Sequence, residues 1–212
     1  MSRVILVRHG ETDWNREEIF RGRADPPLNK KGQNQAEAAG RAISAFKVSA
    51  VYSSPLNRSL ETAKNIAKFH NLPVKEMEGF IDIDFGKWQG LTHKNVKKLY
   101  PGLYQRWLEE PRKVIMPGGE SLDNVRKRSF AALKEILQKD KNGLAVVVSH
   151  RVVNKILICA ILGLDNSSFW NIRQDNCALN IFEFRKNKFV VELINDTCHL
   201  KDFPNDIDRI DF

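Results

Sequence analysis

The chain has 212 residues, 42% of them hydrophobic and 28% charged, as in an ordinary soluble globular protein that can bury a sizeable core. The longest apolar runs fall well short of the ~20 residues that span a bilayer, and the first leads straight into charged residues, unlike a secretory signal. The formal net charge of +8 allows nucleic acid, acidic lipid or a phosphorylated small molecule as partner, but the lysines are scattered, which disfavours nucleic acid and a membrane surface.

The cysteines bear on the cellular compartment. Cys159, Cys177 and Cys198 are widely spaced and form no C-x-x-C pair. We expect inert thiols in a reducing compartment and no structural zinc site. A cytoplasmic protein is therefore the expectation.

The hydrophobic pattern alternates short apolar runs with segments of helical periodicity. The first half of the chain predicts, in order, a buried strand over 4–7, a short helix over 13–18, a shaped loop over 20–28, a helix over 31–46, a strand over 50–53, a helix from 55 to about 70 and a strand near 74. The second half predicts a helix over 92–99, an aromatic-bearing segment over 101–107, an amphipathic helix from 121, a buried strand over 144–149, a helix over 152–162 and strands over 178–184 and 189–194.

Two local signals mark turns and helix ends. Ser54-Pro55 is typical of an N-cap followed by proline at the first helical position. The segment 186–188 separates the last two strands and predicts a hairpin.

Together these elements predict one α/β domain over residues 1–212. Short buried strands that alternate with helices favour a mostly parallel sheet, and the terminal hairpin adds an antiparallel edge. We find no internal repeat, low-complexity tract or interdomain linker. The strand over 189–194 offers an unprotected edge that a second copy can pair with, so a homodimer is a further expectation.

Basic residues gather where three predicted strands give way to helices. Arg8 and His9 follow the first strand, Arg58 lies in the first turn after Pro55, and His150 with Arg151 follows the strand over 144–149. A cation near a helix N-terminus is unfavourable by ~0.3–1 kcal/mol because it opposes the helix dipole. The repetition of such cations on one rim of a parallel sheet therefore indicates a bound anion. Helix N-termini and arginine forks both suit phosphate.

Simpler interpretations exist for each residue taken alone. A histidine at a strand end is more often a packing residue than a catalytic one, and a surface salt bridge with Glu61 would explain Arg58. The coincidence of all the basic groups favours function.

Five motifs follow one another along the chain. They are Arg8-His9-Gly10-Glu11-Thr12, Ser53-Ser54-Pro55-Leu56-x-Arg58-Ser59-x-Glu61-Thr62-Ala63, Phe85-Gly86-x-Trp88-x-Gly90, Gly118-Gly119-Glu120-Ser121 and Val148-Ser149-His150. In this order they resemble the histidine phosphatase (phosphoglycerate mutase-like) superfamily over nearly the whole chain. The resemblance implies a three-layer α/β/α sandwich and two-step phosphoryl transfer without metal or other cofactor.

The resemblance also implies roles for individual residues. His9 matches the nucleophile that becomes phosphohistidine, and it must be neutral to attack. Arg8, Arg58 and His150 match the phosphate pocket, and Asn15 matches a further phosphate-contacting position. These groups would neutralise charge on the transferring oxygens.

The proton donor is the first of three departures from the family pattern. The family usually has Glu where this chain has Asp82, whose side chain is one methylene shorter, with Glu78 and Asp84 as fallback candidates. The other departures are Arg21, which precedes Gly22 where many members have Gln, and Arg151, where Gly is common. We place Arg21, Gly22 and Arg151 in the substrate-binding region, and the two extra cations favour an anionic substrate.

Several functions share this core. The short segment between Gly90 and Pro117 and the residues 11–15 favour a phosphatase over a phosphoglycerate mutase. Segments 109–114 and 195–200 are similar to the metal-independent phosphoserine phosphatase branch, and the α-ribazole phosphatase branch is a close rival. An alternative of another class is a catalytically weak protein that binds or senses a phosphorylated ligand.

Overall fold

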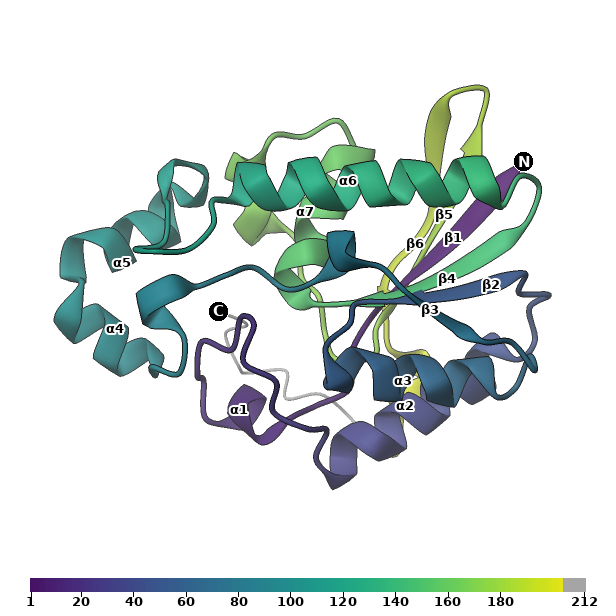
Figure 1. Cartoon of the computed structure of the whole chain (residues 1–212), viewed down its shortest axis with the longest axis horizontal. Coiled ribbons are helices and arrows are strands. Elements are labelled where there is room, and N and C mark those ends of the chain that lie inside the picture. Colours follow the sequence, from purple (N-terminus) through teal and green to yellow (C-terminus); the bar gives the residue numbers. More distant parts are fainter. Residues whose placement is uncertain (204–212) are drawn as a thin grey trace.

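The computed structural model describes residues 1–203. Its centre is a six-stranded sheet in the order β3-β2-β4-β1-β5-β6. The pairs β1–β5 and β5–β6 are antiparallel, and the other neighbouring strands are parallel. The strands are β1 (Ser2–Arg8), β2 (Ala50–Ser53), β3 (Val74–Glu76), β4 (Leu144–Ser149), β5 (Leu179–Arg185) and β6 (Lys188–Asp196). Figure 1 shows this twisted sheet with β1 near its middle.

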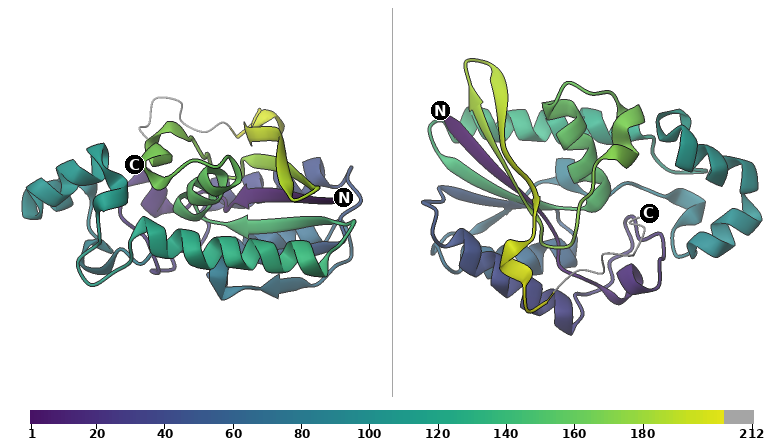
Figure 2. Two further views of the ribbon diagram at one scale, coloured as in Figure 1. Left: turned by 90° about the horizontal axis from the view of Figure 1, so that it is seen from above. Right: turned by 180° about the vertical axis from the view of Figure 1, so that it is seen from behind.

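Helices cover both faces of the sheet, which makes a three-layer α/β/α sandwich (Figures 1 and 2). The α-helices are α1 (Asp13–Arg16), α2 (Lys30–Ile43), α3 (Asn57–Ala67), α4 (His93–Leu99), α5 (Pro101–Glu109), α6 (Leu122–Lys139) and α7 (Arg151–Ile161). The predicted fold class is confirmed. Among residues 1–203, none of the helices is both long and apolar enough to cross a bilayer.

The alternating side chains of the central strands supply two separate cores. Leu6 and Val147 point to the face covered by α6 and α7, whereas Ile5 and Val146 point to the face covered by α2 and α3. Strands buried on both faces read as continuous aliphatic runs, which is why 4–7 and 144–149 were recognisable in the sequence.

A lobe beyond the carboxyl ends of the strands carries α4 and α5 (Figure 1). It packs around the fully buried Trp88 and Trp107, with Tyr104 and Phe169 in ring contact with them. Five short 3-10 helices connect the larger elements in the described part of the chain: η1 (Glu78–Phe80), η2 (Gly86–Trp88), η3 (Pro111–Lys113), η4 (Asn166–Asn171) and η5 (Cys198–Leu200).

Some predicted boundaries are wrong. The helix predicted from Pro55 begins at Asn57 with Leu56 as its N-cap. The Ser54 hydroxyl accepts from the Leu56 N–H at 3.3 Å and lies 2.7 Å from Nε2 of His150. The first short helix ends at Arg16, before Glu18 adopts a positive φ of 53°. The helix predicted to reach 46 ends at Ile43.

Other helix boundaries also differ from the predicted ones. The helix predicted to reach about 70 ends at Ala67, and the helix predicted over 152–162 runs one residue earlier, over Arg151–Ile161. The hairpin is confirmed: its turn residues Lys186 and Asn187 have φ of 47° and 60°, the left-handed pair of a type I′ turn.

Candidate active site

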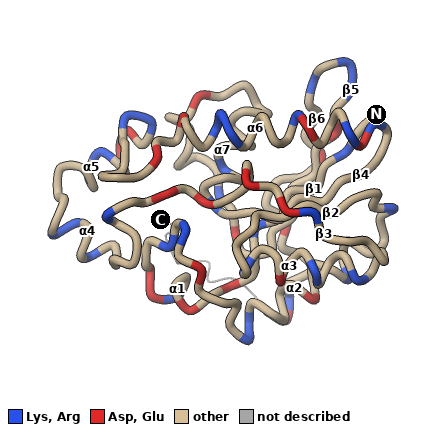
Figure 3. The backbone as a smooth tube through the Cα atoms, in the orientation of Figure 1, with Lys and Arg blue, Asp and Glu red and all other residues tan. Residues whose placement is uncertain are grey.

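The predicted basic residues meet at the carboxyl ends of the parallel strands. Arg8 ends β1 and pairs in register with Ser149, the last residue of β4, so His9 and His150 follow on neighbouring strands. Their ring centroids are 5.3 Å apart. Arg58, near the start of α3, is close enough for its charge to act on both rings. Elsewhere Lys and Arg are spread along the helices and loops (Figure 3), so the cluster stands out by its burial.

His9 is held as a neutral imidazole in one tautomer. Its Nδ1 lies 2.7 Å from the carbonyl oxygen of Gly10, which can only accept a hydrogen bond, so Nδ1 carries the proton and Nε2 keeps a lone pair. The ring is buried, with 1% of its surface exposed. Burial lowers its pKa well below the usual value for histidine, and the charges of Arg58, Arg8 and Arg21 lower it further. The ring therefore offers a nucleophilic nitrogen at neutral pH.

His150 lies beside it, fully buried at the N-cap position of α7. Its Nε2 is 2.7 Å from the Ser54 hydroxyl, and its Nδ1 has no hydrogen-bond partner within residues 1–203. Burial and the charge of Arg58 hold the pKa of His150 well below its usual value, so this ring is neutral as well.

Arg58 anchors the site from α3. Its guanidinium is fully buried and donates to the carbonyl oxygens of Gly22 at 2.8 Å and Ala24 at 2.7 Å. It also forms ion pairs with Asp25 at 3.4 Å and Asp82 at 3.2 Å. A surface salt bridge with Glu61 is therefore wrong as an explanation of this arginine.

Asp82 reaches the cluster despite its short side chain. One carboxylate oxygen accepts from the Ile83 N–H at 2.9 Å, and the other lies 3.2 Å from Arg58 and 3.7 Å from Nδ1 of His150. Arg128, on α6, donates to the Asp82 carbonyl oxygen at 3.1 Å and so fixes the backbone of this segment. The Asp82 carboxylate therefore contacts Arg58 and lies near His150.

The two fallback acids are engaged elsewhere. Asp84 accepts from the Gly86 N–H at 2.8 Å and pairs with Arg23 at 3.6 Å. Glu78 is exposed to solvent in η1. Of these three acids, Asp82 is the one that the structure brings close to His150.

The other predicted site residues are also placed. Arg21 and Arg151 are buried and line a small cavity beside Asp82, together with Gly22, Phe85 and His93. Asn15 uses its side-chain oxygen to accept from the backbone N–H and hydroxyl of Thr12, both at 2.9 Å, and thereby caps α1. A phosphate contact by Asn15 stays a prediction.

A model of the histidine phosphatase superfamily (branch 1) matches residues 4–197. The chain belongs to this superfamily. It is 39% identical over 203 residues to phosphoserine phosphatase 1 of Hydrogenobacter thermophilus, covering 96% of each protein. It is 32% identical to the uncharacterized phosphatase PhoE of Bacillus subtilis, covering 96% of this chain and 99% of the relative.

Solved structures agree with this assignment. YhfR of Bacillus stearothermophilus superposes with a TM-score of 0.91 at 28% identity, covering 95% of this chain and 100% of the other. A phosphoserine phosphatase mutant of Entamoeba histolytica in complex with phosphoserine gives a TM-score of 0.86 at 30% identity, covering 94% and 100%. The predicted family and the phosphatase class are confirmed.

In this histidine phosphatase a buried amide network supports Arg8, and sequence reasoning missed it. Arg8 donates to the carbonyl oxygen of Gln174 at 2.5 Å. The Gln174 side chain exchanges two hydrogen bonds, of 2.7 and 2.9 Å, with Asn180 on β5. Asn180 also donates to the Leu6 carbonyl oxygen at 3.0 Å and accepts from the backbone N–H of Asn195 at 2.9 Å. An asparagine inside the apolar run 178–184 was the available signal.

The loop after His9 is fixed from the opposite side by α2 and α3. Thr62 accepts from the Gly10 N–H at 3.1 Å, and Gln35 accepts from the Glu11 N–H at 3.0 Å. A Cβ atom on Gly32 would lie 2.0 Å from the Glu11 carbonyl oxygen, so only glycine allows this close approach.

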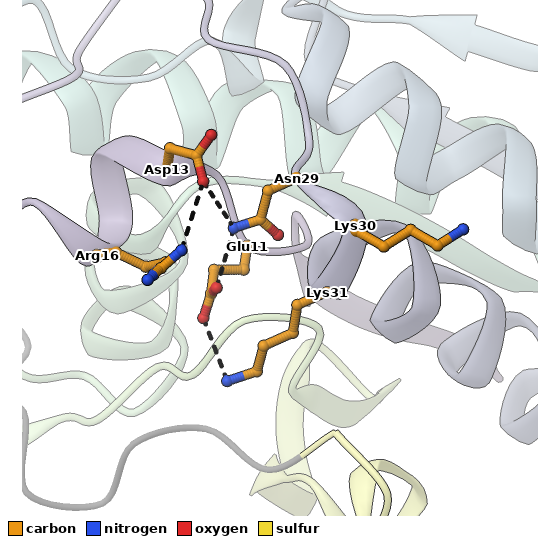
Figure 4. Close-up of a pocket in the computed structure, with 6 residues that line it drawn as sticks. All are labelled: Glu11, Asp13, Arg16, Asn29, Lys30 and Lys31. Carbon is orange, nitrogen blue, oxygen red and sulfur yellow. Dashed lines mark hydrogen bonds and ion pairs between the residues drawn. The ribbon is translucent and has the colours of Figure 1, made fainter.

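The outer side of this loop is a polar cluster, shown in Figure 4. Asn29 donates to Glu11 at 3.0 Å and to Asp13 at 3.3 Å, and Lys31 pairs with Glu11 at 3.4 Å. The backbone next to His9 is therefore held on both sides by hydrogen bonds rather than left as a free loop.

Proposed function

We propose that the protein hydrolyses small phosphomonoesters, with O-phospho-L-serine as the leading substrate, through a phosphohistidine on His9. The observation that carries the proposal is the neutral, buried His9 ring, whose Nε2 keeps its lone pair among guanidinium groups. Nearby cations bind the phosphate dianion and also disfavour protonation of the nucleophile.

The first step forms a bond from Nε2 of His9 to phosphorus while the ester P–O bond breaks. Asp82 gives its proton to the leaving alcohol oxygen. Arg8 and Arg58 neutralise charge on the phosphoryl oxygens, and Nδ1 of His150, which has no hydrogen-bond partner in the described part of the chain, donates to them. In the second step water attacks phosphorus, Asp82 takes a proton from it, and the P–N bond breaks to release phosphate and restore His9.

Two relatives support the choice of substrate. The bacterial relative that is 39% identical is named a phosphoserine phosphatase, and the Entamoeba phosphatase was solved in complex with phosphoserine. A second structure of the Entamoeba phosphatase contains 3-phosphoglyceric acid. Both ligands are three-carbon acids that carry the phosphate on the carbon farthest from the carboxylate.

The enzyme is tested with a phosphate-labelled monoester followed by rapid quenching. We expect an acid-labile, base-stable phosphoprotein in the wild type and none in His9→Ala. A wild type that takes up no label contradicts an enzyme and favours the phospho-ligand-binding alternative. Hydrolysis rates across phosphoserine, α-ribazole phosphate and 3-phosphoglycerate separate the phosphatase branches, and isomerised phosphoglycerate would reveal a mutase.

We further propose that turnover needs no metal ion. The guanidinium groups around His9 supply the positive charge on which phosphoryl transfer depends. Dialysis against EDTA should leave the rate with phosphoserine unchanged, and restoration of a lost rate by a divalent cation would refute this.

We also propose a cytoplasmic homodimer. Support for the compartment comes from the three thiols, all free in the structure. Support for the dimer comes from β6, which ends the sheet and exposes Val191 and Ile194 by 36% and 39%. Light scattering should give twice the chain mass for the wild type and the chain mass for Val191→Lys.

A further inference from the structure

Arg21 is a buried cation that the described part of the chain leaves largely unpaired. Only 9% of its surface is exposed, and it donates a single hydrogen bond, of 3.3 Å, to the Trp14 carbonyl oxygen. Within residues 1–203 its Nε has no partner and no carboxylate forms an ion pair with it. A buried charge is costly unless it is paired, so this guanidinium is suited to meet an anion that residues 1–203 do not supply.

A second arginine faces the same space. Arg151, the first residue of α7, has 7% of its surface exposed and lines one small cavity together with Arg21 and Asp82. The charge of Arg151 acts on Arg21 and, with burial, lowers the pKa of that guanidinium. Two arginines that repel one another are therefore held at the same cavity.

The position of this cavity defines which part of a substrate it contacts. Asp82 lines it, and Asp82 is the group proposed to protonate the leaving oxygen. Atoms attached to that oxygen therefore extend from Asp82 into the space bordered by Arg21 and Arg151. The cavity is also lined by Phe85, His93 and Val152, so Arg21 and Arg151 are the arginines that can recognise an anion there.

We propose that Arg21 and Arg151 form a second anion subsite that binds a carboxylate carried by the leaving group. This inference rests on the proposed phosphatase site and deepens it, because it names the substrate class as monoesters whose alcohol bears a carboxylate. Arginine suits the task, since its planar fork matches the two oxygens of a carboxylate.

The test uses substrates that differ only in the carboxylate. O-phospho-L-serine is compared with O-phosphoethanolamine, and 3-phosphoglycerate with glycerol 3-phosphate. In the wild type we expect kcat/KM to be larger for the carboxylate member of each pair. In Arg151→Gln and in Arg21→Gln we expect that ratio to fall ~10–100-fold, the range for loss of a hydrogen bond to a charged group. Arg106→Gln, at an exposed position on α5, is the matched control and should keep the wild-type ratio.

Direct binding gives a second readout that does not depend on turnover. Phosphonoacetate and methylphosphonate, which differ by a carboxylate, are compared by calorimetry, and the preference for phosphonoacetate should disappear in both variants. If the arginine variants lose kcat/KM or affinity equally for both members of every pair, the two arginines contact only the phosphate and the subsite is refuted. If phosphoserine is not hydrolysed, the substrate proposed above fails, whereas the glycerate pair and the phosphonates still decide the subsite.

Discussion

Replacing Asp82 by asparagine separates two functions of this carboxylate. Asp82 lies 3.2 Å from Arg58 and accepts from the Ile83 N–H at 2.9 Å, so it can hold Arg58 in place as well as transfer a proton. Asparagine keeps the shape and an acceptor oxygen for these contacts but cannot supply the carboxyl proton. General acid catalysis contributes about 10²–10⁴-fold, so kcat/KM with phosphoserine should fall by this factor in Asp82→Asn.

The leaving group provides the internal control. The alkoxide of serine needs a proton to depart, whereas the nitrophenolate of p-nitrophenyl phosphate leaves without one. With the nitrophenyl ester the first step in Asp82→Asn should remain within a few-fold of the wild type. Because Asp82 is also proposed to activate water, the phosphohistidine should accumulate, which stopped-flow absorbance detects as a burst of nitrophenolate.

Folding is checked on the same variant. Loss of the ion pair with Arg58 should lower the free energy of unfolding by about 1–3 kcal/mol, because Asp25 and two carbonyl oxygens still contact the guanidinium. Equal losses of kcat/KM with phosphoserine and p-nitrophenyl phosphate would mean that Asp82 only orients Arg58. Full activity with phosphoserine would remove Asp82 from the proton transfer altogether.

Three further predictions concern stability. His9 and His150 have lowered pKa values in the folded protein, so below pH ~6.5 the unfolded chain binds more protons than the folded chain. The free energy of unfolding should therefore fall by up to about 1.4 kcal/mol per pH unit for each ring as the pH drops. Urea unfolding at pH 7.5 and 5.5 should show a smaller fall in the free energy of unfolding for His150→Gln than for the wild type. Asn180→Ala should lower the free energy of unfolding by about 2–4 kcal/mol in urea and lower kcat/KM, since three buried hydrogen bonds and one part-buried hydrogen bond are lost. An unchanged kcat/KM would show that the network does not act on Arg8. Gly32→Ala should destabilise the fold and reduce activity, because the added Cβ would overlap the Glu11 backbone. Gly102→Ala is the control: nothing lies within 4 Å of its Cβ position, so it should stabilise α5 by about 0.5–1 kcal/mol. A stabilised Gly32→Ala would refute the close approach.

The sheet and the residues at its rim were predictable because their signals are local. The aliphatic runs 4–7 and 144–149 predict strands buried on both faces, and parallel strands put the residues that follow them, His9 and His150, on one edge. Arg58 required one more step, the helix start after Pro55, and the two-residue error in that start still left it in the first turn.

The supporting residues were not predictable, because their partners are far away in the sequence. Gln174 reaches Arg8 across 166 positions, and Arg128 fixes the Asp82 backbone across 46. Ser54 was assigned to a helix cap by its local pattern, yet its hydroxyl is bound to His150, 96 positions away. A long-range partner of a polar side chain leaves no periodicity in the chain.

The arrangement of charge suits both roles proposed for this cluster. Burial and the guanidinium groups beside His9 lower its pKa, which keeps Nε2 unprotonated, and the same groups suit the phosphate dianion that His9 is proposed to attack. Ion pairs with Asp25 and Asp82 offset the cost of burying Arg58, whereas Arg21 has no such partner among the described residues. Within residues 1–203 Arg21 thus has no carboxylate partner, so we expect an anionic ligand that reaches it to stabilise the folded protein.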